Sequence, residues 1–389
     1  MPVRIELRRD AGRIGPTTGP WIRRKQVARV QGLETAEALA EVVTRKGETL
    51  GWGLMSPQSS IAARILTYGE APPADDWLQT RLASALAART HQGYDRQDTT
   101  GYRVVNSEGD GLPGLVVDRY DDDFVLQITT APMAVRRTAI EAWFRAQGHD
   151  RLHVVLPQSA AKHEGFEPGV YRQHDASTLH FREYGIAFET PAPPSQKTGA
   201  YFDQRENRRT VARLAAAHGG PLLDVGCHIG GFALHAARAG AQAVGVDSSS
   251  LALEHAARNA SANGLCGLSW ALDDMFGPLL GGQNAAELAG PFGTIVLDPP
   301  KVATNKNNVD KAVDAMRRLV GRVAPRLAEG GHLVLCSCSH HLGRDHLDRV
   351  MATSAGTWTR VAMLGAGPDH PVMPGHREGE YLRVGVYRR

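Results

Sequence analysis

The stretch "LLDVGCHIGGFALHAARAG", residues 222–240, predicts a buried strand, a glycine-rich turn and a helix in succession. The apolar run that begins at Leu222 stops at the turn, and helical periodicity starts after the paired glycines. Glycines at such a turn let the backbone approach a ligand closely at the carboxyl end of the strand. The stretch therefore predicts one unit of a parallel α/β sheet with a ligand site at its edge.

The same alternation of strands and helices continues on both sides of this stretch. Further strands are expected at 241–247, 268–272, 294–300 and 332–338, and helices at 250–264 and 309–331. Alternating strands and helices are typical of a parallel sheet covered by helices on both faces. We therefore predict a doubly wound, Rossmann-like α/β domain over residues 191–389.

Two blocks of different pattern precede this domain. The first, 1–72, has short strand-like runs at 27–32, 49–56 and 61–66 broken by Gly and Pro, which predicts a small β-rich domain. "APPADD" reads as a linker, in which Asp75 or Asp76 caps an amphipathic helix over 77–90. The second block, 73–190, adds strands, one of them over 182–190, and a helix over 133–148, a mixed α/β pattern. "PAPPSQ", 191–196, marks the next boundary.

Composition limits the class of protein. The chain has 389 residues, of which 42% are hydrophobic, enough for more than one core. Four scattered cysteines favour reduced thiols over a disulfide framework. The N-terminus lacks the apolar segment of a signal peptide, and no window approaches 18 uninterrupted apolar residues. We therefore expect a cytoplasmic protein with no membrane partner.

Charge is unevenly distributed. The segment Met1–Gly32 carries eight basic and two acidic residues, a net charge of +6, while the whole chain carries +3. Such a basic segment is either an ordinary solvated face or a surface that contacts phosphates of a nucleic acid. Both interpretations are open at this point.

Two acidic residues frame the glycine turn. Asp224 precedes it, and Asp247 closes the next strand, where a carboxylate can accept both hydroxyls of a ribose. Gly226 and Gly230 lie in the turn, which lacks the G-x-G-x-x-G spacing of dinucleotide binders. A smaller adenosine-bearing ligand is therefore expected, and S-adenosylmethionine fits. The alternative is that both carboxylates only cap the following helices.

A third acidic position follows the strand 268–272. Asp274 is expected beside the adenine because the apolar Phe276 follows it to pack the ring. Its neighbour Asp273 could take the same place.

Several motifs together resemble a known family. "LLDVGCHIGGF", "VGVDSS", "VLDPPK", "CSCSHH" and "QKTGAYFDQRENRR" (196–209) are similar to the bacterial 23S ribosomal RNA cytosine-5 methyltransferases that carry an N-terminal PUA domain. The resemblance extends into 105–120 and 50–66 and covers nearly the whole chain. It implies a PUA-like RNA-binding domain, a class I S-adenosylmethionine-dependent domain, and ribosomal RNA, 23S in that family, as the partner. It also implies that Gln204 and Arg205, with Phe202 and Asp203 as further candidates, lie near the cofactor.

The cysteines of "HLVLCSCSHH", 332–341, fit the chemistry of this family. Carbon 5 of a pyrimidine is a poor nucleophile, and addition of a thiolate to carbon 6 activates it. Cys336 and Cys338 are two apart and face one way, with Cys338 nearer the edge of the sheet. Cys338 matches the catalytic cysteine of the family and is the predicted nucleophile. Cys336 is expected to be buried filler, and Cys227 and Cys266 to have no chemical role.

Two other interpretations of this stretch are weaker. Cys-x-Cys-x-His-His could bind zinc, but structural zinc sites draw ligands from two separated pairs. A disulfide between Cys336 and Cys338 would be strained. His340 and His341 either bound the site or begin the next helix.

The "LDPPK" motif places Asp298 at the end of the fourth strand. A protonated Asp298 could donate a hydrogen bond to N3 of cytosine, which would make the ring more electrophilic; the alternative is a carboxylate that caps the next turn. Lys301 could contact phosphate or solvent.

The competing functions are methylation of uridine C5, methylation of a base nitrogen, which needs no cysteine, and noncatalytic RNA binding. Cys338 argues against the second, and a homodimer is left open.

Overall fold

The computed structural model describes residues 3–94, 96–172, 177–192, 199–277, 288–303 and 305–389. The chain forms two compact units. One consists of Met1–Ser177 and Pro368–Gly379, and the other of Thr178–Gly367 and Glu380–Arg389. Most of the boundary segment 191–196 and the start of the motif 196–209 lie outside the described residues. The division into domains at residues 72 and 190 stays a prediction.

The first unit begins with a six-stranded sheet in the order β2-β6-β5-β4-β1-β3. The three expected strands are confirmed as β3, β5 and β6, while three others escaped the pattern analysis. The strands are β1 Val3–Leu7, β2 Trp21–Arg23, β3 Val27–Gln31, β4 Leu39–Val43, β5 Thr49–Met55 and β6 Ile61–Tyr68. The expected helix is α1, Trp77–His91. Asp76 is its N-cap residue, but its carboxylate accepts from the Thr80 hydroxyl and makes no cap hydrogen bond.

A five-stranded sheet, ordered β11-β10-β9-β8-β7, completes the first unit. It contains β7 Gly101–Asn106, β8 Leu115–Tyr120, β9 Asp123–Ile128, β10 Arg151–Leu156 and β11 Gly169–Arg172, with helix α4 Gln158–Glu164. The helix predicted over 133–148 is two helices, α2 Ala131–Ala134 and α3 Arg137–Ala146. The single strand expected over 182–190 is also wrong, because the chain turns at Tyr184. It forms the hairpin β12 Thr178–Glu183 and β13 Ile186–Pro191, which groups with the second unit.

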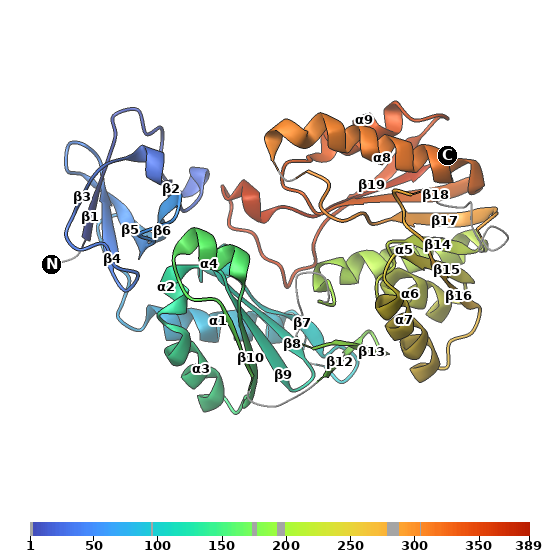
Figure 1. Ribbon diagram of the computed structural model, residues 1–389, viewed down its shortest axis with the longest axis horizontal. Helices are drawn as coiled ribbons and strands as arrows, with labels where there is room; N and C mark the ends of the chain where they lie inside the picture. The colour runs from blue at the N-terminus through green and yellow to red at the C-terminus, as the bar shows by residue number, and fades with distance from the viewer. Residues whose placement is uncertain (1–2, 95, 173–176, 193–198, 278–287, 304) are drawn as a thin grey trace. The chain divides into compact units, whose positions relative to one another are not determined.

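The second unit is built on a seven-stranded sheet in the order β16-β15-β14-β17-β18-β20-β19 (Figure 1). All five predicted parallel strands are confirmed: β14 Leu222–Val225, β15 Ala243–Asp247, β16 Leu268–Leu272, β17 Phe292–Leu297 and β18 Leu327–Ser337. Two strands that the sequence analysis missed, β19 Thr359–Leu364 and β20 Arg383–Arg388, close the edge in antiparallel pairing. The strand order reverses between β14 and β17, the point at which open α/β sheets bind ligands.

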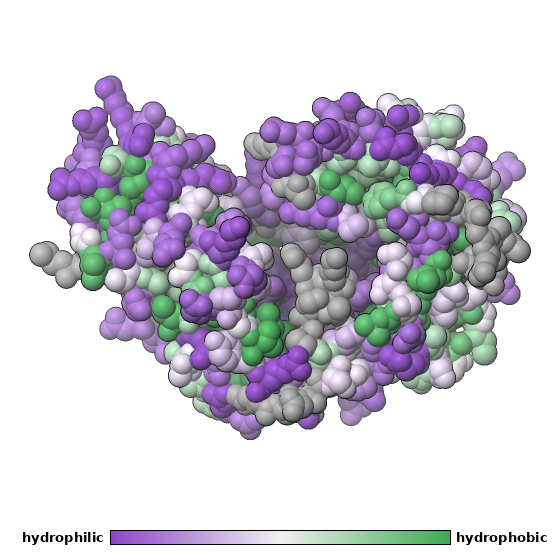
Figure 2. Space-filling view, viewed as in Figure 1, coloured by the Kyte–Doolittle hydropathy of each residue, from purple (hydrophilic) through white to green (hydrophobic). Residues whose placement is uncertain are grey.

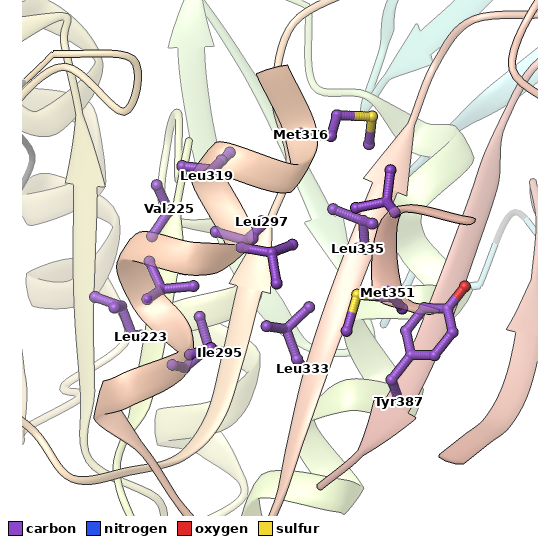
Figure 3. Packing of buried hydrophobic residues seen from close by; sticks show 14 of the residues in the cluster. Leu223, Val225, Ile295, Leu297, Met316, Leu319, Leu333, Leu335, Met351 and Tyr387 are labelled. Atoms are coloured by element: carbon purple, nitrogen blue, oxygen red, sulfur yellow. The ribbon is translucent and has the colours of Figure 1, made fainter. Parts of the chain in front are cut away.

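Helices cover both faces of this sheet. They are α5 Arg205–His218, α6 Gly231–Arg238, α7 Ser250–Ala262, α8 Val309–Val323 and α9 Arg344–Ala352. Successive strand residues point to opposite faces, so Leu333 and Leu335 pack with α8 and α9, as Figure 3 shows for this cluster. Val334 and Cys336 pack with α5 and α6. The predicted doubly wound fold is confirmed.

The helices in the described ranges do not combine the length and apolar character that crossing a membrane requires.

Candidate active site

The predicted site residues gather at one edge of the seven-stranded sheet. Asp247 ends β15, Asp298 follows β17 directly, and Cys338 follows β18 directly. These strands are parallel, so their carboxyl ends share an edge. Gly226 and Asp274 follow β14 and β16 at the same edge. The fold thus brings together residues that are up to 114 positions apart in the chain, from Asp224 to Cys338.

The glycine turn packs against the loop that carries Asp298. Gly226 and Gly230 have φ of 86° and 88°, in the left-handed region that favours glycine. A Cβ at Gly226 would lie 2.5 Å from the Asp298 carbonyl oxygen, and one at Gly230 would lie 2.8 Å from the Trp270 ring. Both glycines are therefore required by contacts within the protein as well as by the shape of the turn. His228, between them, also has a positive φ of 50°.

Asp224 and Asp247 differ in burial and in their hydrogen bonds. Asp224 is fully buried and accepts a hydrogen bond from the Ala233 amide in the first turn of α6, 3.1 Å away. Its other oxygen, Oδ1, has no hydrogen-bond partner among the described residues. Burial raises the pKa of Asp224 to about 7, despite the opposing hydrogen bond from Ala233. Asp224 therefore does contact the following helix, as the capping interpretation expected, and keeps one oxygen unused.

The Asp247 carboxylate accepts backbone hydrogen bonds from the glycine turn and from the loop after β15. Its two oxygens accept hydrogen bonds from the backbone amides of His228 and Ser249, each at 2.9 Å. A carboxylate has about four acceptor sites, so these two contacts leave capacity for ligand hydroxyls. Its proposed role toward a ribose stays a prediction.

The acidic pair after β16 lies close to Asp247. The Asp273 amide donates to the Asp247 carbonyl oxygen. Asp274 is exposed, and its carboxylate accepts from the amide of Phe276, whose side chain is itself 40% exposed. The structure therefore leaves the surface of Phe276 available, as the adenine hypothesis requires, but does not choose between Asp273 and Asp274.

Gln204 connects the motif segment with Asp298. It is buried in the 3-10 turn Phe202–Gln204, and its amide group donates to Asp298 Oδ2 at 3.0 Å and accepts from Asn207 at 2.7 Å. Within the described ranges, the hydrogen bond to the Asp298 carboxylate thus comes from the Gln204 side chain. It does not come from the turn that follows Asp298, as the capping interpretation expected. Arg205 is fully buried at the start of α5. Both residues therefore lie inside the domain, and Gln204 reaches the predicted catalytic group directly.

Asp298 and Cys338 are both shifted toward their neutral forms. Burial and the negative charge of Asp203 raise the pKa of Asp298 to about 7, against the opposing effects of Arg208 and Gln204. Burial, followed by the charges of Asp298 and Asp203, raises the pKa of the Cys338 thiol to about 11. The negative charge of Asp298 therefore acts on the Cys338 thiol at the carboxyl edge.

The other cysteines lie as expected. Cys336 and Cys227 are buried, Cys266 is exposed, and all four cysteines are free thiols. Burial raises the pKa of Cys336 well above its ordinary value, which is consistent with an unreactive side chain.

The loops that carry Asp298 and Cys338 are tied together. The Ser339 hydroxyl is buried and donates to the Ala303 carbonyl oxygen at 2.7 Å. Lys301, in the same loop as Asp298, is exposed. The rings of His340 and His341 pack against each other, with centroids 3.9 Å apart, before α9 begins at Arg344.

A buried ionic network that the sequence analysis missed supports the motif segment. Glu183 is fully buried and accepts from Arg208 at 2.8 Å and contacts His235 at 2.9 Å. Arg208 also donates to the carbonyl oxygens of Ala200 and Tyr201. The available signal was strand alternation, because Glu183 occupies an inward position after Leu179 and Phe181. Tyr201 was also missed: it has a positive φ of 49°, and its ring packs edge-on against His228.

The basic N-terminal segment serves partly to hold its own domain together. Arg24 is half-buried and donates to the carbonyl oxygens of Ser56 and Pro57. Arg4, Arg23 and Arg24 also form ion pairs, with Glu41, Glu378 and Glu34. Four exposed basic residues make no such contact with described residues: Arg9, Arg13, Lys25 and Arg29. Figure 2 shows mainly hydrophilic residues over this domain, so its surface can meet a polar partner.

Two family models match the chain, one in its N-terminal region and one over most of the rest. A family model described as a PUA-like domain matches residues 11–68. A second, described as S-adenosylmethionine-dependent methyltransferase, matches residues 125–377. The chain belongs to this methyltransferase family. The predicted cofactor, S-adenosylmethionine, and the predicted PUA-like domain are thereby confirmed.

Curated relatives match the methyltransferase over its whole length. It is 32% identical to a ribosomal RNA large subunit methyltransferase I of Shewanella frigidimarina over 401 residues, which cover 100% of both chains. It is 33% identical to a ribosomal RNA large subunit methyltransferase of Deinococcus radiodurans, over 94% of this chain and 92% of that one. A crystal structure described as a methyltransferase complexed with SAH matches all of the chain with a TM-score of 0.84 at 18% identity, which supports the fold.

Proposed function

We propose that the protein methylates carbon 5 of a cytidine in ribosomal RNA, 23S RNA by the resemblance of its motifs, with Cys338 as the nucleophile. The observation that carries this proposal is the placement of Cys338 and Asp298 after adjacent parallel strands, beside the glycine turn. Base-nitrogen methylation needs no thiol at this position. The names of the relatives support ribosomal RNA as the substrate.

The chemistry assigns one step to each group. The Cys338 sulfur bonds to carbon 6 of the base, and the electron pair of the 5,6 double bond gives carbon 5 nucleophilic character. Bound S-adenosylmethionine would supply the methyl group that carbon 5 accepts and would leave as S-adenosylhomocysteine. Loss of the carbon 5 proton to water then restores the 5,6 double bond, and the bond between the Cys338 sulfur and carbon 6 breaks.

Asp298 suits the role of a hydrogen-bond donor to N3. With its pKa raised to about 7, it holds a proton near neutral pH far more readily than an ordinary aspartate. A protonated carboxyl group donates to the ring nitrogen and draws electrons from the ring as sulfur adds. The raised pKa of Cys338 means that the thiol is neutral in the free protein, so its proton passes to water as the sulfur adds to carbon 6.

The residues at the turn fit S-adenosylmethionine. Asp247 retains acceptor capacity for ribose hydroxyls, and Asp224, with its unused buried oxygen, would favour a cationic group close by. Three exposed apolar side chains would pack the adenine: Leu251 follows β15, Leu272 is the last residue of β16, and Phe276 follows it. Gln204, Arg205, Gly226, Gly230 and Asp274 complete the proposed cofactor set.

We further propose that residues 1–72 form the RNA-binding domain and that the protein acts in the cytoplasm, where its substrate is made. The exposed basic residues Arg9, Arg13, Lys25 and Arg29 would contact phosphates.

The decisive experiment is product analysis. The full-length protein is incubated with 23S RNA transcripts and S-adenosylmethionine carrying a labelled methyl group, and the digested nucleosides are separated by mass spectrometry. Labelled 5-methylcytidine is expected. Labelled 5-methyluridine or an N-methylated base would replace the proposal with one of its competitors, and an unlabelled product pool with intact cofactor binding would favour a noncatalytic RNA-binding protein.

A further inference from the structure

One segment of the C-terminal part of the chain belongs to the first unit. Residues Pro368–Gly379, here called the strap, lie between β19 and β20 of the methyltransferase sheet but group with Met1–Ser177. The chain therefore leaves the second unit after Gly367 and returns to it at Glu380.

The strap is anchored in the first unit along its length. Asp369 is fully buried; its carboxylate accepts from the Arg103 amide at 3.0 Å, and its carbonyl oxygen accepts from Arg89 at 2.8 Å. Farther along, the buried His376 packs edge-on against Trp21 of β2, with ring centroids 4.6 Å apart. The strap thus contacts both the six-stranded and the five-stranded sheet regions of that unit.

Two residues of the second unit that flank the strap, Gly367 and Tyr381, both contact Asp203 of that same unit. The amide of Gly367, just before the strap, donates to the Asp203 carbonyl oxygen at 3.3 Å. The hydroxyl of Tyr381, just after it, donates to Asp203 Oδ2 at 2.7 Å. Asp203 is only 8% exposed, and its Oδ1 has no hydrogen-bond partner among the described residues. A buried carboxylate with so few donors is costly, so a structural reason for its position is expected.

Asp203 is also one residue from the group that holds Asp298. It lies in the 3-10 turn Phe202–Gln204, and Gln204 donates to the Asp298 carboxylate. A displacement of this turn would move the Gln204 donor and change the distance between the charge of Asp203 and the two reacting groups. We propose that Asp203 is a positioning residue that couples the docking of the strap in the first unit to the geometry of Asp298 and Cys338 in the second.

The consequence is that the first unit would control methyl transfer through the chain itself. When the strap is docked, the flanking residues Gly367 and Tyr381 hold Asp203, and the turn keeps Gln204 on Asp298. When the strap is displaced, Asp203 loses one or both donors and the turn is free to shift. This inference rests on the proposed methyl transfer for its activity readout, but the hydrogen bonds and the strap can be tested without substrate.

The tether is tested with Tyr381→Phe, which removes one hydrogen bond and keeps the ring and the charge of Asp203. We expect faster hydrogen exchange in residues 368–379 and roughly a tenfold fall in kcat on the RNA that the wild type methylates. The matched control is Tyr387→Phe in β20, which removes a hydrogen bond to Asp348 of α9 and should leave strap exchange and kcat unchanged. A wild-type kcat in Tyr381→Phe, with or without faster exchange, would overturn the coupling.

The strap side is tested with Asp369→Ala, alone and combined with Tyr381→Phe. If the strap transmits its docking through Asp203, each change loosens the same connection and their effects on kcat are not additive. Full additivity would show two independent defects and would overturn the proposal.

The charge of Asp203 is tested without any RNA. The titratable groups that Asp203 influences or contacts are Tyr201, Asp298, Cys338 and Tyr381, and the Gly367 amide donates to its carbonyl oxygen. Because Asp203 raises the pKa of Cys338, Asp203→Asn should move the alkylation profile of Cys338 with iodoacetamide to lower pH, measured in a Cys266→Ala background that removes the exposed thiol. An unmoved profile would separate Asp203 from the reacting thiol and refute its role. If the wild type methylates no RNA while the alkylation profile and strap exchange respond as expected, the proposed function fails and the coupling stands.

Discussion

The carboxyl edge of the methyltransferase sheet and the basic segment Met1–Gly32 both draw attention by their charges, but the fold uses those charges in opposite ways. At the edge, Asp224, Asp298 and Cys338 are withdrawn from water and their pKa values rise. In the basic segment the arginines either bind the domain's own carbonyl and carboxylate groups or extend into solvent.

The difference teaches which sequence signals are reliable. An acidic residue at the end of a predicted parallel strand has a position fixed by the strand, so its location follows from periodicity. A run of arginines has no such constraint, because each long side chain can turn to a local acceptor. The charge of a segment therefore overestimates the charge that it offers to a partner.

The largest effect is expected at the carboxyl edge, from replacement of Cys338. Cys338→Ala should fold and bind cofactor and RNA, but lose methyl transfer by roughly 10³-fold or more, because no other group activates carbon 5. With RNA that carries 5-fluorocytidine at the target, fluorine prevents removal of the carbon 5 substituent, so wild type should remain covalently attached in a denaturing gel.

Cys336→Ala provides the control, since Cys336 points into the apolar layer with α5 and α6. It should form the covalent band, retain methyl transfer and lose about 1 kcal/mol of stability. If the band disappeared in Cys336→Ala and persisted in Cys338→Ala, the assignment of the nucleophile would be reversed.

The positions of these cysteines could be predicted because they depend on one strand. The alternation Leu333, Val334, Leu335, Cys336 between the two faces of β18 follows from the strand period of two. The connection between Tyr381 and Asp203 could not be predicted in this way, since it joins residues 178 positions apart through the folded strap. The hairpin turn at Tyr184 escaped notice because its φ of 51° is rare for a residue other than glycine.

The second test concerns the buried network under the motif segment. Burial would raise the pKa of Glu183, but Arg208 and His235 outweigh this effect and lower it from 4.5 to about 2. Glu183→Gln leaves Arg208 buried without its carboxylate and should lower the free energy of unfolding by about 3 to 5 kcal/mol in urea titrations at pH 7. Glu254→Gln, on the exposed face of α7, should change it by less than about 0.5 kcal/mol.

The same network sets a pH dependence whose sign is fixed. Because the pKa of Glu183 is lower in the folded state, its contribution is complete above about pH 4.5 and is lost as pH falls toward about 2. The wild type should therefore lose more stability than Glu183→Gln between these two pH values. Parallel curves for the two proteins would contradict the assigned pairing.

Asp247 provides a test of intermediate size. Asp247→Ala should weaken binding of S-adenosylmethionine by about 1.5 to 3 kcal/mol, a factor of roughly 10 to 150 in Kd by calorimetry, because ribose hydroxyls would lose a charged acceptor. Asp247→Asn keeps an acceptor for the turn amides of His228 or Ser249 and separates support of the turn from ligand contact. Unchanged affinity in a folded Asp247→Ala protein would move the cofactor elsewhere on the edge.

The smallest effect is expected from the basic segment, and it decides which arginines face RNA. Replacing Arg13, Lys25 and Arg29 together by Ala should weaken RNA binding and reduce the slope of log K against log salt by roughly 2 to 3, since each phosphate contact releases a counterion. Cofactor affinity should not change.

Arg24→Ala should instead lower the stability of the N-terminal domain, because Arg24 donates to the carbonyl oxygens of Ser56 and Pro57, and should leave the salt slope of the folded protein unchanged. An unchanged slope in the triple variant would remove these side chains from the RNA interface, and a reduced slope in folded Arg24→Ala would show that net charge alone had located the contact after all.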